Sequence, residues 1–206
     1  DEGATLFMVL LTAFNAVLHR ITGQSDLAIG TPVAGRNRSE IEPLIGFFVN
    51  TLVLRTDVSG DPTFRELLGR VRETALGAYA HQDLPFEKMV RAVYADREYS
   101  FPGWPVGIVF QLDDARPGVP EMSELSVETW QIGTGTSKFP MAFILWNEDG
   151  QLAGGVEYLV DLFDRADVMR LIRCFEHALR QFATAPTLPV SELSFAPEGP
   201  NGAHHV

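Results

Sequence analysis

Residues 4–22 restrict the fold of this chain most, because they would be apolar on nearly every side of a helix. A helix on the surface of a globular protein carries one apolar stripe, whereas here large apolar side chains point in almost all directions. These side chains are Leu6, Val9, Leu10, Phe14, Val17, Leu18 and Ile21. The sequence therefore predicts a helix that is buried within a core built by the rest of the chain, with Gly23 placed to end it.

Other apolar runs predict a sheet for this helix to pack against. The run at 47–55 is the strongest, and both of its period-2 faces are mostly apolar. We therefore expect a central strand that is covered on both sides. Further strands are expected at 26–30, 106–112, 125–132, 141–146 and 152–159, the last two as a hairpin around 147–150.

Three more helices are expected, one ending near 80, one starting at Leu84-Pro85 and one over about 165–183. The first is opened either by Asp61-Pro62 or by a capping box of Thr63 and Glu66. This order of elements predicts an α/β fold, an α+β two-layer sandwich with helices packed on a mixed sheet.

The charge balance and the cysteine count exclude several classes of function. The 206 residues carry 16 Lys and Arg against 27 Asp and Glu, so the net charge is −11. This charge repels phosphate backbones and anionic lipid, and we expect neither nucleic acid nor a membrane as a partner. Cys174 is the only cysteine, which excludes an intrachain disulfide and a cysteine-based zinc site. No run approaches the roughly 20 apolar residues of a membrane span, and a cytoplasmic protein is expected.

We expect one lobe over residues 1–185 and a linker or tail over 186–206. The tail is rich in proline and glycine, which is typical of a connecting segment. Both ends of the chain look as if they were cut from something longer.

No self-contained active site is evident from the residue pattern. The sequence lacks a G-x-S-x-G elbow, a Walker phosphate loop and an H-E-x-x-H zinc motif. His19 and His177 lie inside predicted helices and His204-His205 lies in the tail, so packed or solvated roles are favoured. His81 stands at a helix end, where a structural role is favoured over catalysis. We therefore predict no catalytic residue and no metal site.

The loop at 31–43 carries the first group of candidate binding residues. Arg36 and Arg38 follow Gly35 in a segment that could hold an anion or a substrate backbone. A solvated loop in which these arginines pair with Glu40 or Glu42 explains the pattern equally well.

Two further positions carry residues that a purely structural role does not readily explain. Asn50 interrupts an apolar strand, and because a buried amide must be hydrogen-bonded, we expect it to pin an adjacent loop rather than contact substrate. Ser137 and Lys138 follow a flexible glycine-rich link and precede the hairpin, which suggests the edge of a cleft.

Four segments together resemble one known family, the condensation domains of nonribosomal peptide synthetases. The resemblance spans about residues 5–185, with the four blocks in the order and roughly the spacing of the family. The blocks are TGQSDLAIGTPVAGR at 22–36, IGFFVNTLVLR at 45–55, HQDLPFEKMV at 81–90 and SKF at 137–139. Together they are highly specific, although each alone is a weak signal.

The resemblance implies a chloramphenicol acetyltransferase-like fold, two lobes of which make a full condensation domain. Such a domain forms an amide bond between thioesters carried on the phosphopantetheine arms of a donor and an acceptor carrier domain. The family's catalytic His-His-x-x-x-Asp-Gly motif lies in the N-terminal lobe, and here His204-His205 is followed only by Val206. The chain therefore resembles the C-terminal lobe, inactive alone, with no cofactor bound directly.

The resemblance also implies roles for particular residues and partners. The loop around Gly35 and Arg36 corresponds to the floor of the substrate tunnel, and 130–139 to a latch between the lobes. The residues implied for the tunnel or for carrier docking are Gly35, Arg36, Arg38, Trp104, Trp130, Ser137 and Lys138. Asn50, His81, Gln82 and Asp83 belong to structural motifs. The implied partners are the N-terminal lobe, both carrier domains and an adenylation domain after the tail.

Two departures from the family pattern leave other functions open. Trp104 stands where the family usually has an asparagine, and Pro140 stands where an aspartate is common. The alternative function is a catalytically inactive module that recruits a carrier protein or another partner. A third is a free-standing acyltransferase lobe that uses His81.

Overall fold

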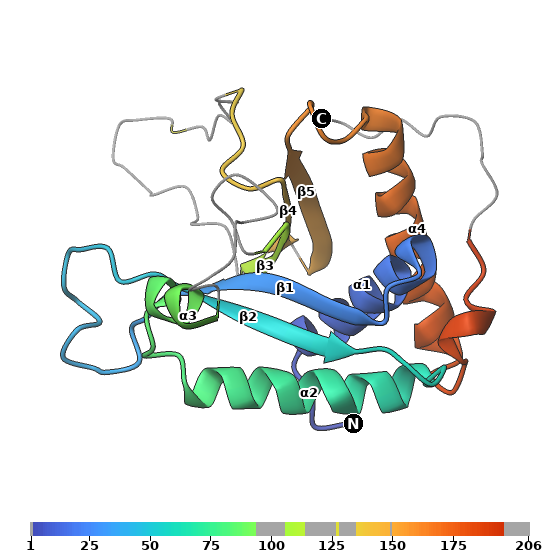
Figure 1. The fold of residues 1–206 in the computed structure, drawn as a ribbon, viewed down its shortest axis with the longest axis horizontal. Helices are drawn as coiled ribbons and strands as arrows, with labels where there is room; N and C mark the ends of the chain where they lie inside the picture. The colour runs from blue at the N-terminus through green and yellow to red at the C-terminus, as the bar shows by residue number, and fades with distance from the viewer. Residues whose placement is uncertain (1, 94–105, 114–126, 128–134, 149, 196–206) are drawn as a thin grey trace.

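The computed structural model describes residues 2–93, 106–113, 127, 135–148 and 150–195 (Figure 1). In these residues one mixed sheet has the strand order β2-β1-β3-β4-β5, with the inner pairs β1/β3 and β3/β4 parallel and the two outer pairs antiparallel. The elements are α1 (Leu6–Thr22), β1 (Asp26–Val33), β2 (Asn50–Asp57), α2 (Phe64–Ala80), α3 (Phe86–Val93), β3 (Ile108–Asp113), β4 (Met141–Glu148), β5 (Gln151–Tyr158), α4 (Arg165–Thr184) and the 3-10 turn η1 (Val190–Glu192). The predicted sandwich of helices on a mixed sheet is confirmed.

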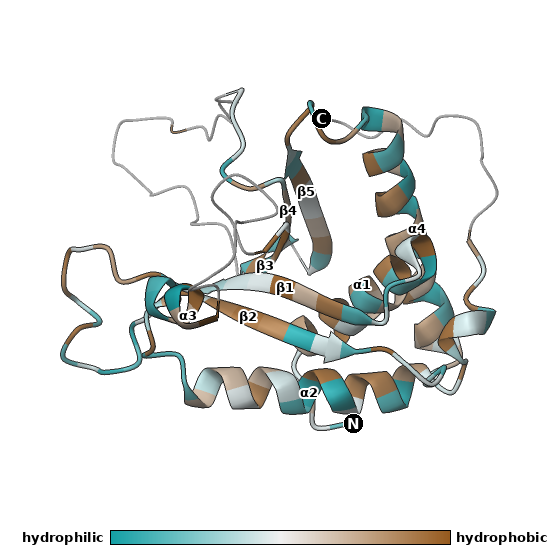
Figure 2. Ribbon diagram, in the orientation of Figure 1, coloured by the Kyte–Doolittle hydropathy of each residue, from teal (hydrophilic) through white to brown (hydrophobic). Residues whose placement is uncertain are grey.

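Helix α1 forms the middle of the core, as its apolar sequence predicts. It packs against α2, α4 and β3, and all residues from Leu10 to Leu18 are buried. Phe14 is fully buried among the rings of Phe110, Phe143 and Phe175, which come from β3, β4 and α4. Figure 2 shows hydrophobic residues along α1 and the strands next to it. Gly23 ends the helix in a left-handed conformation at φ 72°.

The prediction of a central strand at 47–55 is wrong about the residue at which the strand begins and about its position in the sheet. The strand begins at Asn50, and β2 lies at the edge of the sheet, where it pairs with β1. Its inner face buries Leu52 and Leu54 toward the helices, whereas Arg55 on the other face is exposed. Phe47 lies before the strand, and its side chain is 89% exposed. Its ring is therefore part of a loop surface and does not pack on a sheet face.

Several other boundaries follow from local chemistry. The capping box of Thr63 and Glu66 opens α2, and the alternative start at Asp61-Pro62 is wrong because Asp61 has a left-handed φ of 49°. The hairpin of β4 and β5 is confirmed, with Gly150 N–H donating to Asn147 Oδ1 at 2.9 Å in its turn. The predicted strand at 125–132 lies almost wholly outside the described residues.

The first ten residues beyond 185 pack on the same core. Val190 and Leu193 are buried, and Pro189 forms a β-bridge with Thr63. Ser191 donates from its backbone N–H and its hydroxyl to the carboxylate of Asp61, at 2.8 and 2.6 Å. The division of the chain at 185 stays a prediction, but these contacts join residues 186–195 to the start of α2.

We expect Asp61→Asn to lower the free energy of unfolding at neutral pH and to have no effect in acid. The hydroxyl and N–H of Ser191 hold the pKa of the Asp61 carboxyl below its ordinary value of 3.8. Because the folded-state pKa is the lower one, this stabilisation is complete above pH 3.8 and is lost as the pH falls through the folded-state value. Asparagine tolerates the left-handed backbone, so the substitution removes the charge and one of the two acceptor oxygens without adding backbone strain.

Urea unfolding of both proteins, from neutral pH down to acid, measures this difference. Asp161→Asn is the matched control, because Asp161 is an exposed loop residue. A difference between wild type and Asp61→Asn that stays constant over the whole pH range would contradict the assignment.

Candidate functional site

A long loop at 34–49 connects β1 to β2 and extends beyond the ends of both strands (Figure 1). Its two sides meet closely at its base. Gly35 has φ 64°, and a Cβ atom built there would lie 1.9 Å from the carbonyl oxygen of Phe48. Because no side chain fits this approach, glycine at 35 is needed to close the base of the loop.

Arg36 holds the inside of this loop. Its Nη1 donates to the carbonyl oxygens of Ile41 and Glu42 at 2.6 and 3.0 Å, and its Nη2 donates to Gly46 O at 3.2 Å. The guanidinium also lies over the ring of Phe48, 4.5 Å from the ring centroid. The sequence suggested an anion site or a pair with Glu40 or Glu42, but the partners are backbone carbonyls.

The loop is tied to the turn between α2 and α3 by two asparagines. Asn50 Nδ2 donates to the carbonyls of Gln82 and Leu84, both at 2.8 Å, and its Oδ1 accepts from Phe86 N–H at 3.0 Å. Asn50 thus has the loop-pinning contacts that its place in an apolar strand predicts. Asn37 Nδ2 donates to Asp83 Oδ1 at 3.0 Å, a contact that the sequence did not indicate.

The other candidate side chains have structural contacts. His81 follows α2 and its Nδ1 lies 2.9 Å from Gly77 O, which places a proton on that nitrogen. Ser137 Oγ donates to Phe139 O at 2.6 Å within its own segment, and Lys138 is exposed. Trp104 and Trp130 lie outside the described residues. Burial raises the pKa of the Cys174 thiol, which makes it a poor nucleophile.

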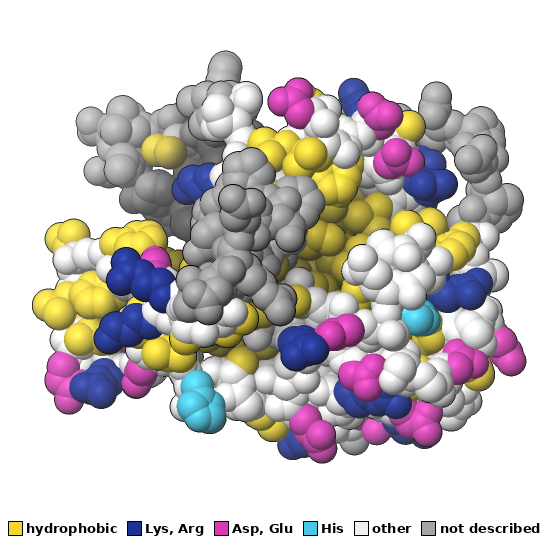
Figure 3. Space-filling view, in the orientation of Figure 1, with side chains coloured by type: hydrophobic (Ala, Val, Ile, Leu, Met, Phe, Trp, Pro, Cys, Tyr) yellow, Lys and Arg dark blue, Asp and Glu magenta, His cyan; other side chains and the backbone are white. Residues whose placement is uncertain are grey.

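The 34–49 loop presents large apolar side chains to solvent. Figure 3 shows hydrophobic side chains gathered at the left end of the molecule, with Lys and Arg side chains among them. Figure 2 shows the same loop with hydrophobic stretches. The exposed fractions are 50% for Leu44, 104% for Ile45, 89% for Phe47 and 46% for Val49. We call these four residues the loop patch. Exposed apolar side chains gathered in this way favour a site of interaction with another surface.

The charge of this end of the molecule differs from that of the whole chain. Residues 34–50 and 81–93 hold four basic and four acidic side chains, so their net charge is zero, whereas the whole chain has −11. The basic residues are Arg36, Arg38, Lys88 and Arg91, and the acidic residues are Glu40, Glu42, Asp83 and Glu87. The acidic excess therefore comes from other segments of the sequence, and these two segments add no net charge that would repel another surface.

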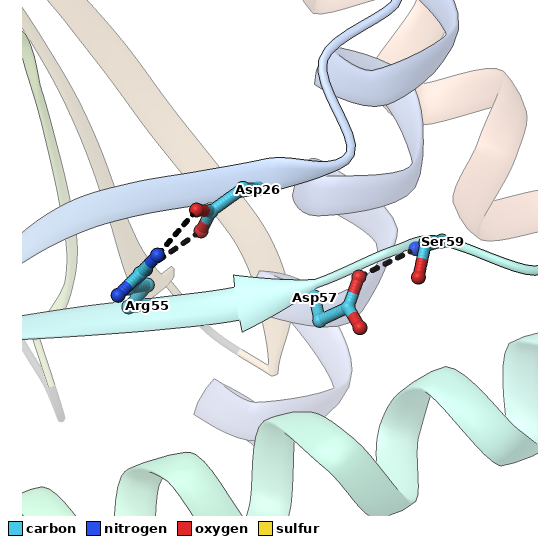
Figure 4. A network of polar contacts seen from close by, with 4 residues as sticks. All are labelled: Asp26, Arg55, Asp57 and Ser59. Carbon is cyan, nitrogen blue, oxygen red and sulfur yellow. Dashed lines mark hydrogen bonds and ion pairs between the residues drawn. The ribbon is translucent and has the colours of Figure 1, made fainter.

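A polar network lies at the opposite end of the β1/β2 hairpin (Figure 4). Arg55 donates from Nε and Nη2 to the two carboxylate oxygens of Asp26, at 2.8 and 2.6 Å. This bidentate contact lowers the pKa of the Asp26 carboxyl, and Ser59 lowers that of Asp57. Both side chains of the pair are more than half exposed, so the pair is expected to add little to stability.

The described part of the chain shows neither a metal-binding cluster nor a membrane-spanning helix. No group of three or more His, Cys, Asp or Glu side chains there is arranged to hold a metal ion. Among the described helices, none has the length and apolar character to cross a membrane.

Comparisons with known proteins agree on one family. The family model described as condensation domain matches residues 1–202. A linear gramicidin synthase from Brevibacillus parabrevis is 44% identical over 195 residues, which cover 94% of this chain and 2% of that protein. Malpinin synthetase from Mortierella alpina is 43% identical over 190 residues, which cover 92% of this chain and 2% of that protein. The chain thus spans a small part of the length of these relatives.

Solved structures show the same fold. The X-domain from teicoplanin biosynthesis is similar with a TM-score of 0.81 and 29% identity, over 95% of this chain and 45% of that chain. The complex of the X-domain and OxyB gives the same TM-score with 30% identity, over 96% of this chain and 44% of that chain. A four-domain nonribosomal peptide synthetase bound to AMP and glycine has a TM-score of 0.85 over 94% of this chain and 16% of its own, and at 24% identity it shows the fold alone.

The matched family model, the identity to two synthetases and the shared fold lead to a single assignment. The motif blocks at 22–36, 45–55 and 81–90, which resemble this family, are also the segments that meet at the 34–49 loop. We conclude that these 206 residues belong to the condensation domain family of the nonribosomal peptide synthetases.

Proposed function

We propose that this chain is the C-terminal lobe of a condensation domain that forms amide bonds between carrier-bound aminoacyl or peptidyl thioesters. The loop patch is the observation that carries the proposal, because the 34–49 loop exposes four large apolar side chains that a partner must cover. The chain also covers only 45% of a solved relative of the same fold, and it lacks His-His-x-x-x-Asp-Gly. An N-terminal lobe that carries this motif would supply both the cover and the catalytic histidine.

In this proposal the 34–49 loop reaches toward the N-terminal lobe and forms the floor of the substrate tunnel. Gly35 and Arg36 act by shaping this loop, and the segment 130–139, with Trp130, Ser137 and Lys138, acts as the latch. Trp104 lines the tunnel region. An adenylation domain follows the tail.

Substrates arrive on the phosphopantetheine arms of donor and acceptor carrier domains. The amine of the acceptor attacks the donor thioester carbonyl, so that a C–N bond forms, the C–S bond breaks and the amine proton passes to the released thiol. The basic side chains of Arg38 and Lys138 are exposed and are available to attract acidic carrier domains.

Reconstitution of the domain from its two lobes tests this function. Donor and acceptor carriers loaded with aminoacyl thioesters are incubated with this chain, with the N-terminal lobe, or with both, and the amide product is measured by mass spectrometry. We expect product only with both lobes, and none when the histidines of the N-terminal motif are replaced by alanine. Product from this chain alone, or no product from the assembled pair, would overturn the proposal.

A second candidate function is a module that recruits a partner and does no chemistry. It is supported by the similar structure in which an X-domain is in complex with OxyB. In the same reconstitution, this candidate predicts that the assembled lobes bind a carrier or partner protein without any amide product. The third alternative, an acyltransferase that uses His81, stays a prediction, because the bond from Nδ1 to Gly77 O does not engage Nε2, the nitrogen that would act as the base.

A further inference from the structure

The Arg36 side chain makes more contacts within its own loop than a residue that only docks a partner would need. Three of its N–H groups donate to carbonyls at 41, 42 and 46, and the face of its guanidinium lies on Phe48. All four contacts are with the 34–49 loop itself. Arg38, two residues further on, is exposed and has no hydrogen bond or ion pair from its side chain to a described residue.

The contacts of Arg36 surround the segment that carries the loop patch. Ile41, Glu42 and Gly46 flank Leu44 and Ile45, and Phe48 follows Phe47 directly. Other hydrogen bonds within this stretch are short-range turns, from Ile41 N–H to Arg38 O and from Leu44 N–H to Ile41 O. A loop of this length that lacks helix or strand loses much conformational entropy when it is ordered, so contacts that span more of the loop than these turns help to define its shape.

We propose that Arg36 is a positioning residue, which orders the 34–49 loop so that the loop patch is presented as one surface to the N-terminal lobe. This inference rests on the proposed function for the identity of the covering partner. Its role is geometric rather than electrostatic, since its charge is directed into the loop. The guanidinium is needed because its planar fork reaches three carbonyls while its face stacks on a ring, which a single ammonium group cannot do.

The geometric role makes an unusual prediction for the conservative variant. Arg36→Lys keeps the positive charge and loses the fork, so it should behave like Arg36→Ala. For a residue that attracts acidic carriers through its charge, the lysine variant should behave like wild type. Arg38→Lys and Arg38→Ala provide this contrast in the same loop, and Arg180→Lys on the exposed surface of α4 is a control far along the chain.

Hydrogen exchange of the backbone amides in the chain is the first measurement. We expect both Arg36 variants to speed exchange at Ile41 and Leu44, whose N–H groups form the turns inside the loop, by about tenfold or more. The Arg38 and Arg180 variants should leave these amides unchanged, and amides of α1 should be unchanged in every variant. Unaltered exchange at Ile41 and Leu44 in Arg36→Lys would overturn the inference.

Amide formation by the assembled lobes is the second measurement. We expect both Arg36 variants to lower kcat by about tenfold or more, because a misplaced tunnel wall misaligns the reacting groups. Arg38→Ala should instead raise KM for the carrier, and Arg38→Lys should restore it. Wild-type kcat in Arg36→Lys, together with a raised KM in Arg36→Ala, would assign a docking role and overturn the inference. If wild-type lobes make no amide, the proposed function fails, while the exchange data still decide the role of Arg36.

Discussion

Replacement of Phe14 by alanine is expected to cost about 3–5 kcal/mol of folding free energy. The Phe14 ring is fully buried, and its centroid lies 4.9 Å from that of Phe110, 5.0 Å from Phe143 and 6.0 Å from Phe175. These partners come from β3, β4 and α4, so the ring joins the central helix to two strands and to another helix. Its removal leaves a cavity at the junction of these elements, where no single element can move to fill it.

Urea unfolding followed by circular dichroism measures this loss. Since domains are stable by only about 5–15 kcal/mol, a large part of the stability disappears. Phe14→Leu keeps most of the buried volume and should be less harmful than Phe14→Ala. Phe47→Ala is the matched control for an exposed ring and should change stability by no more than about 0.5 kcal/mol. Equal losses from the alanine variants at 14 and 47 would contradict the packing described here.

Replacement of Asn50 by alanine is expected to cost about 2–3 kcal/mol, since it removes three hydrogen bonds of roughly 1 kcal/mol each. Asn50 uses both hydrogens of its amide nitrogen, on Gln82 O and Leu84 O, and its oxygen on Phe86 N–H. No other side chain has two donors and one acceptor in this short planar arrangement. The turn between α2 and α3 should become mobile, and the end of β2 with it.

Asn50→Asp makes the prediction more specific. The carboxylate retains an acceptor for Phe86, but it has no donor for the two carbonyls and places a negative charge beside them. It should therefore be at least as destabilising as Asn50→Ala at neutral pH, and less so in acid, where protonation removes the charge. Asn37→Ala removes one exposed hydrogen bond and is the control. A similar small loss for Asn37→Ala and Asn50→Ala would show that other contacts hold the turn.

The features that sequence predicts well here are those encoded by neighbours along the chain. The periodicity of residues 4–22 predicts a buried helix, and the spacing of Thr63 and Glu66 predicts the capping box. The hairpin of β4 and β5 follows from two runs on either side of a polar turn. Each of these patterns is complete within about 20 residues, so no knowledge of tertiary structure is required.

The features that sequence misses depend on contacts from outside the local pattern. Phe47 looks like part of a strand because it is apolar, and only the sheet order shows that the strand starts later, at an edge. The partners of Arg36 are carbonyls, which every residue has, so residue types could not reveal them. In the candidate site, the pinning contacts of Asn50 were foreseeable, whereas the link from Asn37 to Asp83 was not.

The packing of residues 186–195 has a practical consequence for recombining synthetase modules. The sequence suggests the end of α4 as a suitable point to join two modules, because a proline-rich segment follows it. Such a junction would remove Val190 and Leu193 from the core and leave Asp61 without Ser191. A graft made after this chain should therefore keep its own residues at least through Phe195, which also packs against the core.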